Sequence, residues 1–298
     1  MASDIAIDMS AARRQSQRAA RMRTIGQVVA NVFSTVVAIS FMFPFLWTVS
    51  SSLKTAYEVI SFPPHLVPKV PQWNNYIETW TSIDFAHFFS NSIVVTVLAV
   101  FGQVVSSMMV AYGFARFRFP GREILFLVCL SGMMMPVYVT IIPLFDVFRH
   151  LGWIDTLKPL IVPSYFGSAF AIFLLRQFIM TIPFDLDESA LIDGASRMTI
   201  LVRILLPNCK PAIASVAIFA FRGQWNNFLG PLIFLDSQEK FTLPLGLWFL
   251  RSYADEPGLP KEHLLMAGAV ITTLPVLIVF SLAQKSFIRG IVMSGIKG

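Results

Sequence analysis

Long hydrophobic stretches alternate with shorter polar ones along most of the chain. Six of them contain about 20 mostly apolar residues or more, the length that a helix needs to cross the ~30 Å hydrocarbon core of a bilayer. They cover residues 28–50, 91–114, 124–147, 159–180, 211–235 and 264–285. None alternates apolar and polar residues as a membrane β-strand does, and backbone groups in lipid must be paired within the segment. The pattern predicts an all-α, polytopic membrane helix bundle with six transmembrane helices.

The distribution of positive charge indicates how this bundle is oriented. Of the 23 Lys and Arg residues, 15 lie at the two chain ends and in or beside the second and fourth connections, whereas seven lie in or beside the other three. Basic residues collect on the cytoplasmic side of a membrane, and Trp residues collect at its interfaces. The sequence therefore predicts that both termini are cytosolic. Five of the six Trp residues lie at or beyond the predicted outer ends of the spans: Trp47, Trp73, Trp80, Trp153 and Trp248.

Composition agrees with a membrane location and narrows the classes of function. The 298 residues have a mean hydropathy of +0.67, and 13% are charged, against about a quarter in soluble domains. Despite a net charge of +6, no basic face with interleaved aromatic residues indicates nucleic-acid binding. No Walker A loop or catalytic triad indicates an enzyme, and the two Cys and four His residues have no metal-ligand spacing. We expect a non-catalytic membrane protein that binds no cofactor itself.

The polar segments divide the chain into an arm, a membrane domain and three notable loops. Residues 1–27 form a cytosolic arm, flexible or weakly helical, and residues 28–298 form the transmembrane domain. The first long stretch has no cleavage site after it, so we expect it to act as an uncleaved targeting signal. The outer loops are residues 52–90 and 236–263, the longest cytosolic loop is 181–210, and the cytosolic tail is 286–298.

The loop at 181–210 is much longer than a passive connection between two helices requires. Asp185 followed by Glu188 predicts an N-cap and a capping box directly after Pro183. Leu186, Ala190, Leu191 and Ile192 would give this first short helix an apolar face. Asp193-Gly194 is a turn signal, because Gly adopts positive φ without strain.

A second short helix is predicted from about Ser196 to Pro207, with Pro211 opening the next span. Met198, Leu201, Val202 and Leu205 would form one apolar side of this helix. Two interpretations of the double helix stay open on physical grounds. It could fill a groove on a partner protein, or it could lie on the inner leaflet as an interfacial amphipathic segment.

The same loop resembles the EAA signature of binding-protein-dependent ABC importer permeases. That pattern is Glu-Ala-Ala, three residues, Gly, nine residues and Ile-x-Leu-Pro, and the chain has Glu188-Ser189-Ala190, Asp193-Gly194-Ala195, Ile204 and Leu206-Pro207 at this spacing. The chain has Ser189 where Ala is usual. The resemblance implies a coupling helix that docks on an ATPase subunit, with these as the coupling residues: Glu188, Ser189, Ala190, Asp193, Gly194, Ala195 and Pro207.

The resemblance extends over nearly the whole chain and is to the smaller permease of maltose-type carbohydrate importers. It rests on Trp225-Asn226-Asn227-Phe228 with Pro231-Leu232, on Thr242–Leu247, on Met266-Ala267-Gly268, and on the tail from Gln284 to Gly298. Asn227 stands where that family has an acid. The resemblance implies a type I ABC importer permease fold in a bacterial inner membrane. It also implies a second homologous permease, two ATPase subunits that hold ATP and Mg, and an extracytoplasmic solute-binding protein that contacts the outer loops.

A polar cluster in the fifth span is a candidate substrate path. Arg222 lies near the middle of that span, where an Arg costs about 2.5–3.5 kcal/mol, so we expect it to face the protein interior or a wet cavity. Gln224, Trp225, Asn226 and Asn227 follow it and would suit a carbohydrate, through amide hydrogen bonds and aromatic stacking. The alternative is that these groups join helices to each other or to a partner subunit.

We therefore expect a permease subunit of an ATP-driven importer that carries a carbohydrate, an oligosaccharide in our interpretation, by alternating access. Arg222 leaves open an acidic sugar or a sugar or glycerol phosphate as the cargo. A secondary transporter is a more distant alternative. It would place acids for proton or sodium coupling at midspan, whereas Asp146 and Asp236 lie at outer ends.

Overall fold

The computed structural model describes the backbone of residues 2–82, 84–254 and 261–295 and the side chains of residues 21–81, 84–251 and 261–284. Every regular element in these ranges is helical, which confirms the all-α prediction. In chain order the elements are α1 (Ala2–Ser52), α2 (Ala56–Val59), α3 (Asn74–Ser82), α4 (Phe85–Arg116), α5 (Arg122–Ser131), η1 (Gly132–Met134), α6 (Val137–His150), α7 (Lys158–Ile161), η2 (Val162–Phe166), α8 (Ala169–Met180), α9 (Asp185–Ile192), α10 (Arg197–Ile200), the π-helical turn η3 (Leu201–Leu205), α11 (Leu206–Asn208), α12 (Lys210–Trp225), α13 (Leu229–Phe234), η4 (Gln238–Lys240), α14 (Leu243–Ala254) and α15 (Glu262–Gly295).

Four helical stretches of the described chain are long and apolar enough to cross a membrane unaided. They are Arg21–Ser52, Phe85–Arg116, Lys158–Met180 and Glu262–Gln284, and they match four of the six predicted spans. Two bent pairs raise the number to six if each pair is one span. Arg122–Met134 and Val137–His150 meet at 99°, and Arg197–Asn208 and Lys210–Trp225 meet at 80°.

The predicted continuous spans 124–147 and 211–235 are each interrupted, and the local chemistry explains both breaks. Pro136 follows Met135, whose ψ of 121° is extended, as the residue before a proline must usually be. In the other span, α12 ends at Trp225 and α13 begins at Leu229. Between them, the Asn226 side chain donates to a carbonyl of α12, and the Asn227 side chain accepts from a backbone N–H of α13. Asn side chains that bond the backbone in this way compete with helical pairing.

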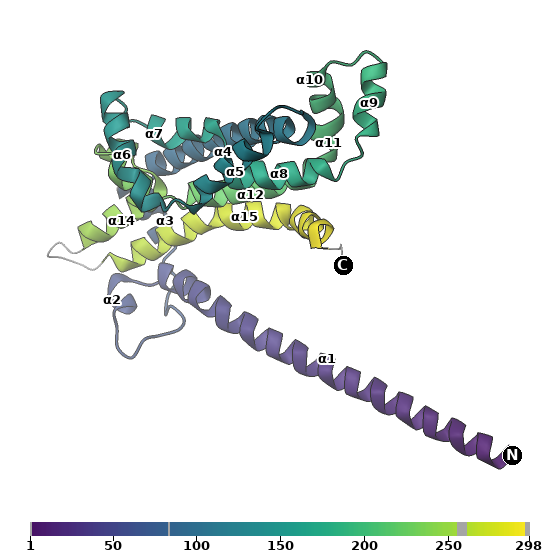
Figure 1. Ribbon diagram of the computed structural model, residues 1–298. Coiled ribbons are helices and arrows are strands. Elements are labelled where there is room, and N and C mark those ends of the chain that lie inside the picture. The colour runs from purple at the N-terminus through teal and green to yellow at the C-terminus, as the bar shows by residue number, and fades with distance from the viewer. Residues whose placement is uncertain (1, 83, 255–260, 296–298) are drawn as a thin grey trace.

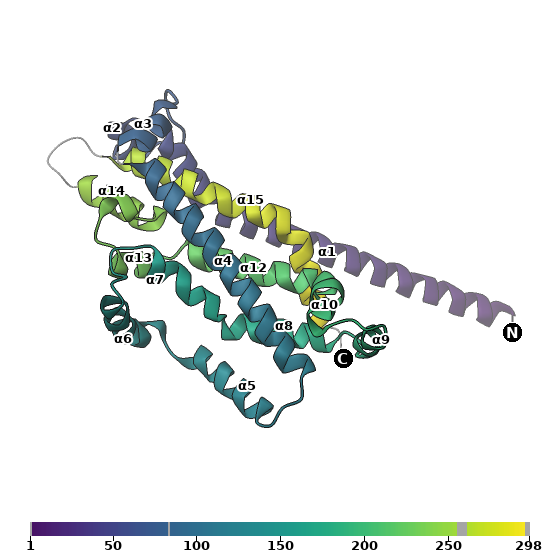
Figure 2. The same ribbon diagram turned by 90° about the horizontal axis from the view of Figure 1, so that it is seen from above.

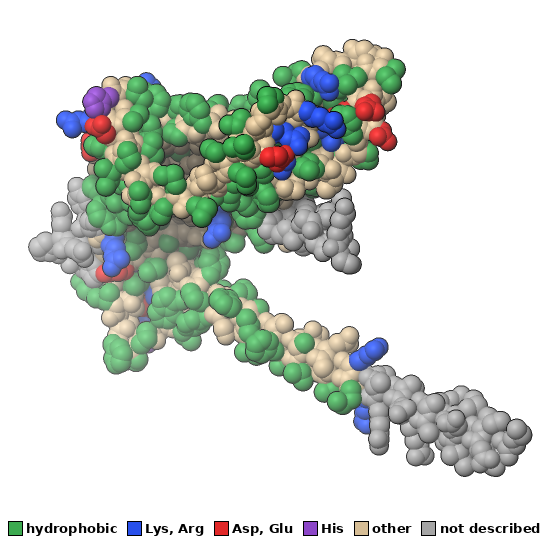
Figure 3. Space-filling model, in the orientation of Figure 1, with side chains coloured by type: hydrophobic (Ala, Val, Ile, Leu, Met, Phe, Trp, Pro, Cys, Tyr) green, Lys and Arg blue, Asp and Glu red, His purple; other side chains and the backbone are tan. Residues whose placement is uncertain are grey.

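Helices α4, α8 and α12 pack together at the centre, and α15 packs against both α12 and α1 (Figures 1 and 2). Helix α1 extends away from the bundle toward its N-terminal end. Helix α9, the N-terminal part of α1 and the C-terminal part of α15 lie at one end of the molecule, and α2, α3 and α14 lie at the other. In Figure 3, charged side chains gather at the two ends of the visible bundle face and mostly hydrophobic ones cover the middle. Below, the α9 end is called the inner end and the α14 end the outer end, following the predicted orientation.

Two separate hydrophobic cores hold the bundle together. The inner core joins α4, α8, the α10–η3 segment and α12, and its fully buried members include Ala111, Leu175, Ile179, Ile200 and Leu205. The outer core joins α4 with α14 and the chain around α13, and its most buried members are Phe85, Phe88, Leu243 and Leu245. Helix α4 contributes to both cores, so it fixes their relative position.

The predicted loops and arm are more helical than their composition indicates. The arm at 1–27 continues into the first span, since α1 runs from Ala2 to Ser52 without a break. The outer loop at 52–90 contains α2 and α3, and α4 begins inside it at Phe85. The outer loop at 236–263 contains η4 and α14, although residues 255–260 lie outside the described part. In the tail at 286–298, α15 continues to Gly295 and the rest lies outside the described residues.

One acid fastens two outer loops to each other. Asp155 adopts a positive φ of 57°, and its carboxylate accepts hydrogen bonds from the backbone of Asp236 and from the backbone and hydroxyl of Ser237. Lys240 Nζ lies 2.8 Å from the same carboxylate. These donors, Lys240 first, hold the pKa of Asp155 well below its usual value. The carboxylate therefore stays charged and fixes the start of the loop that leads to α14.

Candidate functional site

The segment α9–α11 projects beyond the inner end of the bundle (Figure 1). Its first helix begins at Asp185, two residues after Pro183, but the predicted capping box does not form. The N-cap residue is Phe184, whose carbonyl accepts from the N–H groups of Asp187 and Glu188, and no side chain caps this end. Asp185 is instead the first helical residue. The carboxylates of this first turn still lie where the helix dipole favours negative charge.

The turn between the two short helices depends on Gly194, as predicted. Gly194 has φ of +80°, and nothing lies within 4 Å of where its Cβ would be. Its N–H bonds the carbonyl of Leu191, and the N–H of Ala195 bonds that of Ala190, so the end of α9 is closed by backbone bonds. The position therefore requires left-handed backbone and leaves open space for a side chain.

The second short helix begins where the sequence predicts but has two faces instead of one apolar side. Ser196 is its N-cap, and its hydroxyl accepts from the N–H of Thr199. Leu201 and Leu205 are buried in the inner core, whereas Met198 and Val202 are exposed, so the prediction of one shared side is wrong. The π-helical turn η3 takes more residues per turn than an α-helix and so separates these positions. The helix also continues through Pro207 to Asn208.

The segment consequently presents an exposed apolar face next to exposed acids. Ile192 is 86% exposed and Met198 57%. Among the predicted coupling residues, Ala190 and Ala195 pack partly against the inner core. The other predicted coupling residues are exposed: Glu188, Ser189, Asp193, Gly194 and Pro207.

A buried ion pair that sequence reasoning missed attaches this segment to the bundle. Arg116 Nε, on the last turn of α4, lies 2.9 Å from Asp187 Oδ2, and the side chain of Asp187 is fully buried. Arg116 also donates to the carbonyl of Ile182 at 3.0 Å and lies over the ring of Phe184. The sequence contains one indication of this burial. Asp187 lies three residues before the half-buried Ala190 and therefore on the same face of the helix.

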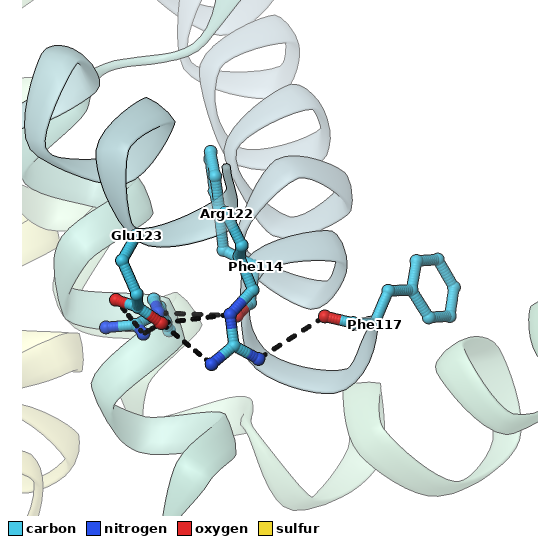
Figure 4. Close-up of polar contacts among 5 residues, drawn as sticks. Phe114, Phe117, Arg122 and Glu123 are labelled. Atoms are coloured by element: carbon cyan, nitrogen blue, oxygen red, sulfur yellow. Dashed lines mark hydrogen bonds and ion pairs between the residues drawn. The ribbon is translucent and has the colours of Figure 1, made fainter. Parts of the chain in front are cut away.

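A second charged cluster joins the inner ends of α4, α5 and α8. Figure 4 shows the Glu123 carboxylate turned toward the Arg122 guanidinium, 2.7 Å away, with Arg122 also donating to the Phe117 carbonyl. Arg176, from α8, lies 3.4 Å from both oxygens of Glu123 and donates to the Phe114 carbonyl. Since Arg176 is buried, its charge needs this partner. The inner end is therefore held by two arginines that reach between helices.

The predicted substrate-path residues divide into two groups. Arg222 and Asn226 are exposed, and the Arg222 guanidinium has no hydrogen bond or ion pair within the described residues. Gln224 donates to the Ser164 hydroxyl, while its Oε1 is buried with no partner in the described chain. Asn227 bonds the backbone of Gly230. Arg222 is thus the charged member of the set without a partner in the described chain, and Gln224 the member with a buried unpaired oxygen.

Trp225 is buried and serves helix packing in this conformation. Its Nε1 donates to the carbonyl of Thr272 in α15 at 3.0 Å. One face stacks on Phe221 with ring centroids 5.6 Å apart, and the edge of Phe89 also meets the ring. This placement agrees with the helix-joining alternative for Trp225, because neither face of the indole is open to a sugar.

The fold and the projecting double helix define an integral-membrane transport subunit. The chain matches the family described as "Binding-protein-dependent transport system inner membrane component" over residues 103–292. The diacetylchitobiose uptake system permease protein NgcG of Streptomyces coelicolor is 34% identical over 92% of this chain and 89% of its own length. The arabinooligosaccharides transport system permease protein AraQ of Bacillus subtilis is 36% identical over 92% and 97%.

A solved structure shares the same fold. It is that of a bacterial ABC transporter involved in the import of the acidic polysaccharide alginate, with a TM-score of 0.78, 24% identity, and coverage of 88% of this chain and 96% of that one. The chain therefore belongs to the binding-protein-dependent transport system inner membrane components, as a non-catalytic, multi-pass permease subunit of an ABC transporter. This assignment replaces the secondary-transporter alternative.

The buried pair gives a direct test of how the segment is held. Asp187→Asn leaves Arg116 as an unpaired buried charge, a change that costs about 3–5 kcal/mol in comparable cases. We expect a lower melting temperature in detergent and faster tryptic cleavage after Arg197 and Arg203, which lie on the loosened segment. Asp185→Asn is the matched control, because that acid is exposed and has no partner in the described chain. Equal stability of the two variants would contradict this assignment.

Proposed function

We propose that this chain is one of two homologous permease subunits of an ATP-driven importer in a bacterial cytoplasmic membrane. Two ATPase subunits, which hold ATP and Mg, bind the inner end, and an extracytoplasmic solute-binding protein delivers the cargo to the outer end. The cargo is a carbohydrate, specifically an oligosaccharide. Among the described residues of this chain, no group of three or more His, Cys, Asp or Glu side chains is placed to hold a metal ion.

The double helix α9–α11 is the observation that supports this proposal most. Exposed Ile192 and Met198 lie beside exposed acids, while the opposite side is anchored in the inner core and by the pair of Arg116 and Asp187. A segment that only rested on lipid would not need a buried ion pair to hold it to the bundle. A segment that transmits force from another protein needs both a free contact face and a firm attachment. Of the EAA-like residues at 188–195, Glu188, Ser189, Asp193 and Gly194 are exposed and available to a partner, whereas Ala190 and Ala195 pack partly against the inner core.

The oligosaccharide cargo is supported by the relatives. NgcG and AraQ are named for diacetylchitobiose and arabinooligosaccharides, and each aligns with nearly the whole of this chain. Transport then follows alternating access. ATP binding closes the ATPase pair, α9 moves with its docking site, and the bundle changes from inward-facing to outward-facing to receive cargo from the binding protein.

An acidic cargo is the second candidate, and Arg222 is the observation that favours it. The side chain is exposed in the last turn of α12, near the break before α13, and has no hydrogen bond or ion pair in the described residues. A uronate oligomer or a sugar or glycerol phosphate would supply the missing anion.

Gly194 tests the coupling assignment. Gly194→Val forces a β-branched residue into left-handed backbone at a cost of roughly 1–2 kcal/mol per residue, so the turn should change shape while membrane insertion stays intact. In proteoliposomes with the complete importer, we expect ATP hydrolysis to continue and uptake per ATP to fall about tenfold. Gly194→Asn is the control, because Asn tolerates positive φ and should retain most uptake. Normal uptake by the Val variant would show that the turn does not couple.

Arg222 separates the two cargo classes. Losing a charged hydrogen bond costs about 1.5–3 kcal/mol, so Arg222→Ala should reduce uptake of an alginate oligomer about tenfold or more if the cargo is acidic. Uptake of a neutral arabino-oligosaccharide should not change. Arg149→Ala serves as the control, since Arg149 is exposed outside the candidate path. Equal losses for both substrates, or no loss for either, would contradict a role for Arg222 in selecting an anion.

A further inference from the structure

Helix α4 differs from the other candidate spans of the described chain in its lack of proline. It runs for 32 residues from Phe85 to Arg116, about 48 Å at the rise of an α-helix, and contains no proline. Each of the other candidate spans or bent pairs contains at least one proline, and two of them are bent by 80° or more. Proline is the commonest cause of a helix kink, so α4 is the stiffest connection between the two ends of the bundle.

The inner end of α4 holds both short helices of the projecting segment. Arg116 bonds residues on both sides of the turn into α9, namely the carbonyl of Ile182 and the carboxylate of Asp187. One turn earlier, the Tyr112 hydroxyl donates to the carbonyl of Arg197, the first residue of α10. Tyr112 and Arg116 lie four residues apart and so face the same way. The last two turns of α4 thus contact the segment at Asp187 and Arg197 and the turn that leads into it at Ile182.

The outer end of α4 is fastened in the same manner to the loop between α13 and α14. The amide of Asn91 donates to the carbonyls of Glu239 and Phe241, at 2.8 and 3.0 Å. The Ser92 hydroxyl accepts from the N–H of Leu243 at 2.7 Å, in a buried position. These bonds tie α4 to η4 and to the first residue of α14.

The outer contact between α4 and α14 is also closely packed. A Cβ built on Gly246 would lie 2.1 Å from the ring of Phe88, which is itself fully buried. Helix α14 therefore lies directly against α4, and neither surface has room to slide past a side chain. The polar contacts of Asn91 and Ser92 then determine the register between the two elements.

We propose that α4 is a rigid link that transmits movement of the α9–α10 segment to the outer loop at 236–263, with Arg116 and Asn91 as the positioning residues at its two ends. The inference rests on the proposed function, because it takes the inner segment as the site where the ATPase acts. It adds a route across the membrane. The route uses a helix that does not adjoin the segment in sequence.

The proposed route depends on how α9 is connected to α8 and to α4. Helix α9 is joined to α8 through the short turn from Thr181 to Phe184, and α8 also packs with α10 and η3 in the inner core. Movement of α9 reaches α4 through a buried ion pair and a hydrogen bond, which hold a fixed geometry because breaking them leaves buried charges unpaired. Asn91 and Arg116 are 25 residues apart on one helix, so a tilt or shift of one end displaces the other by a comparable amount.

Spin-label distances test the link without needing the natural cargo. The complete importer, with both native cysteines of this chain replaced, is labelled at Glu239→Cys in the outer loop and at Tyr57→Cys on α2, both exposed sites. The distance between them is measured by pulsed electron paramagnetic resonance with and without a nonhydrolysable ATP analogue and Mg. Asn91→Asp removes the donor at nearly constant shape, and Asn74→Asp makes the same change at an exposed outer residue with no such bonds. Arg116→Gln breaks the inner contact, with Arg118→Gln as its control.

We expect nucleotide to shift the distance in the wild type and in both controls, and the shift to be lost in Asn91→Asp and Arg116→Gln while nucleotide binding persists. A wild-type shift in the Asn91→Asp variant would overturn the link. A distribution that broadens equally with and without nucleotide would also overturn it, because the residue would then be merely structural. If Arg116→Gln fails to assemble, the Asn91→Asp result decides alone. Absence of any shift in the wild type would instead count against the proposed function.

Discussion

The contact between Arg116 and Asp187 is the interaction on which the rest of this account depends. Burying either charge alone would cost several kcal/mol, so each requires the other, and the pair fixes the position of α9 relative to the end of α4. Everything proposed about force transmission assumes that this position is fixed. Without the pair, α9 would be attached to the bundle through its chain connections and the buried side of α10 and η3. The exposed face of the segment would then have no firm base.

The membrane imposes the second constraint. Spans in lipid must pair their backbone groups internally, and a break is tolerated where other protein groups cover it. Most spans here contain proline and two are sharply bent, whereas α4 is uninterrupted and packs into both the inner and the outer core. The bundle therefore combines one stiff central helix with more deformable neighbours. Such a division suits a protein that must change between two conformations while keeping one part of its frame intact.

Sequence reasoning predicted the features that depend on local composition. Hydropathy located the four continuous candidate spans, and turn chemistry located Gly194 with its positive φ and the start of the second short helix at Ser196. It failed where a residue's role depends on a distant partner. Asp185 was expected to cap α9, although Phe184 precedes the helix and the important acid is Asp187, which can be recognised only when α4 is placed beside it. The two broken spans depend instead on local residues that a hydropathy pattern does not weigh, namely Pro136 and the pair Asn226 and Asn227.

The central claim is that the exposed face of α9–α11 contacts an ATPase subunit and not lipid. A photo-crosslinking amino acid placed at Ile192, whose side chain is 86% exposed, tests it in membranes that contain the whole importer. The account predicts a covalent adduct with the ATPase subunit, identified by mass spectrometry and altered by nucleotide. Adducts with phospholipid alone would contradict it, because the segment would then be an interfacial helix on the inner leaflet.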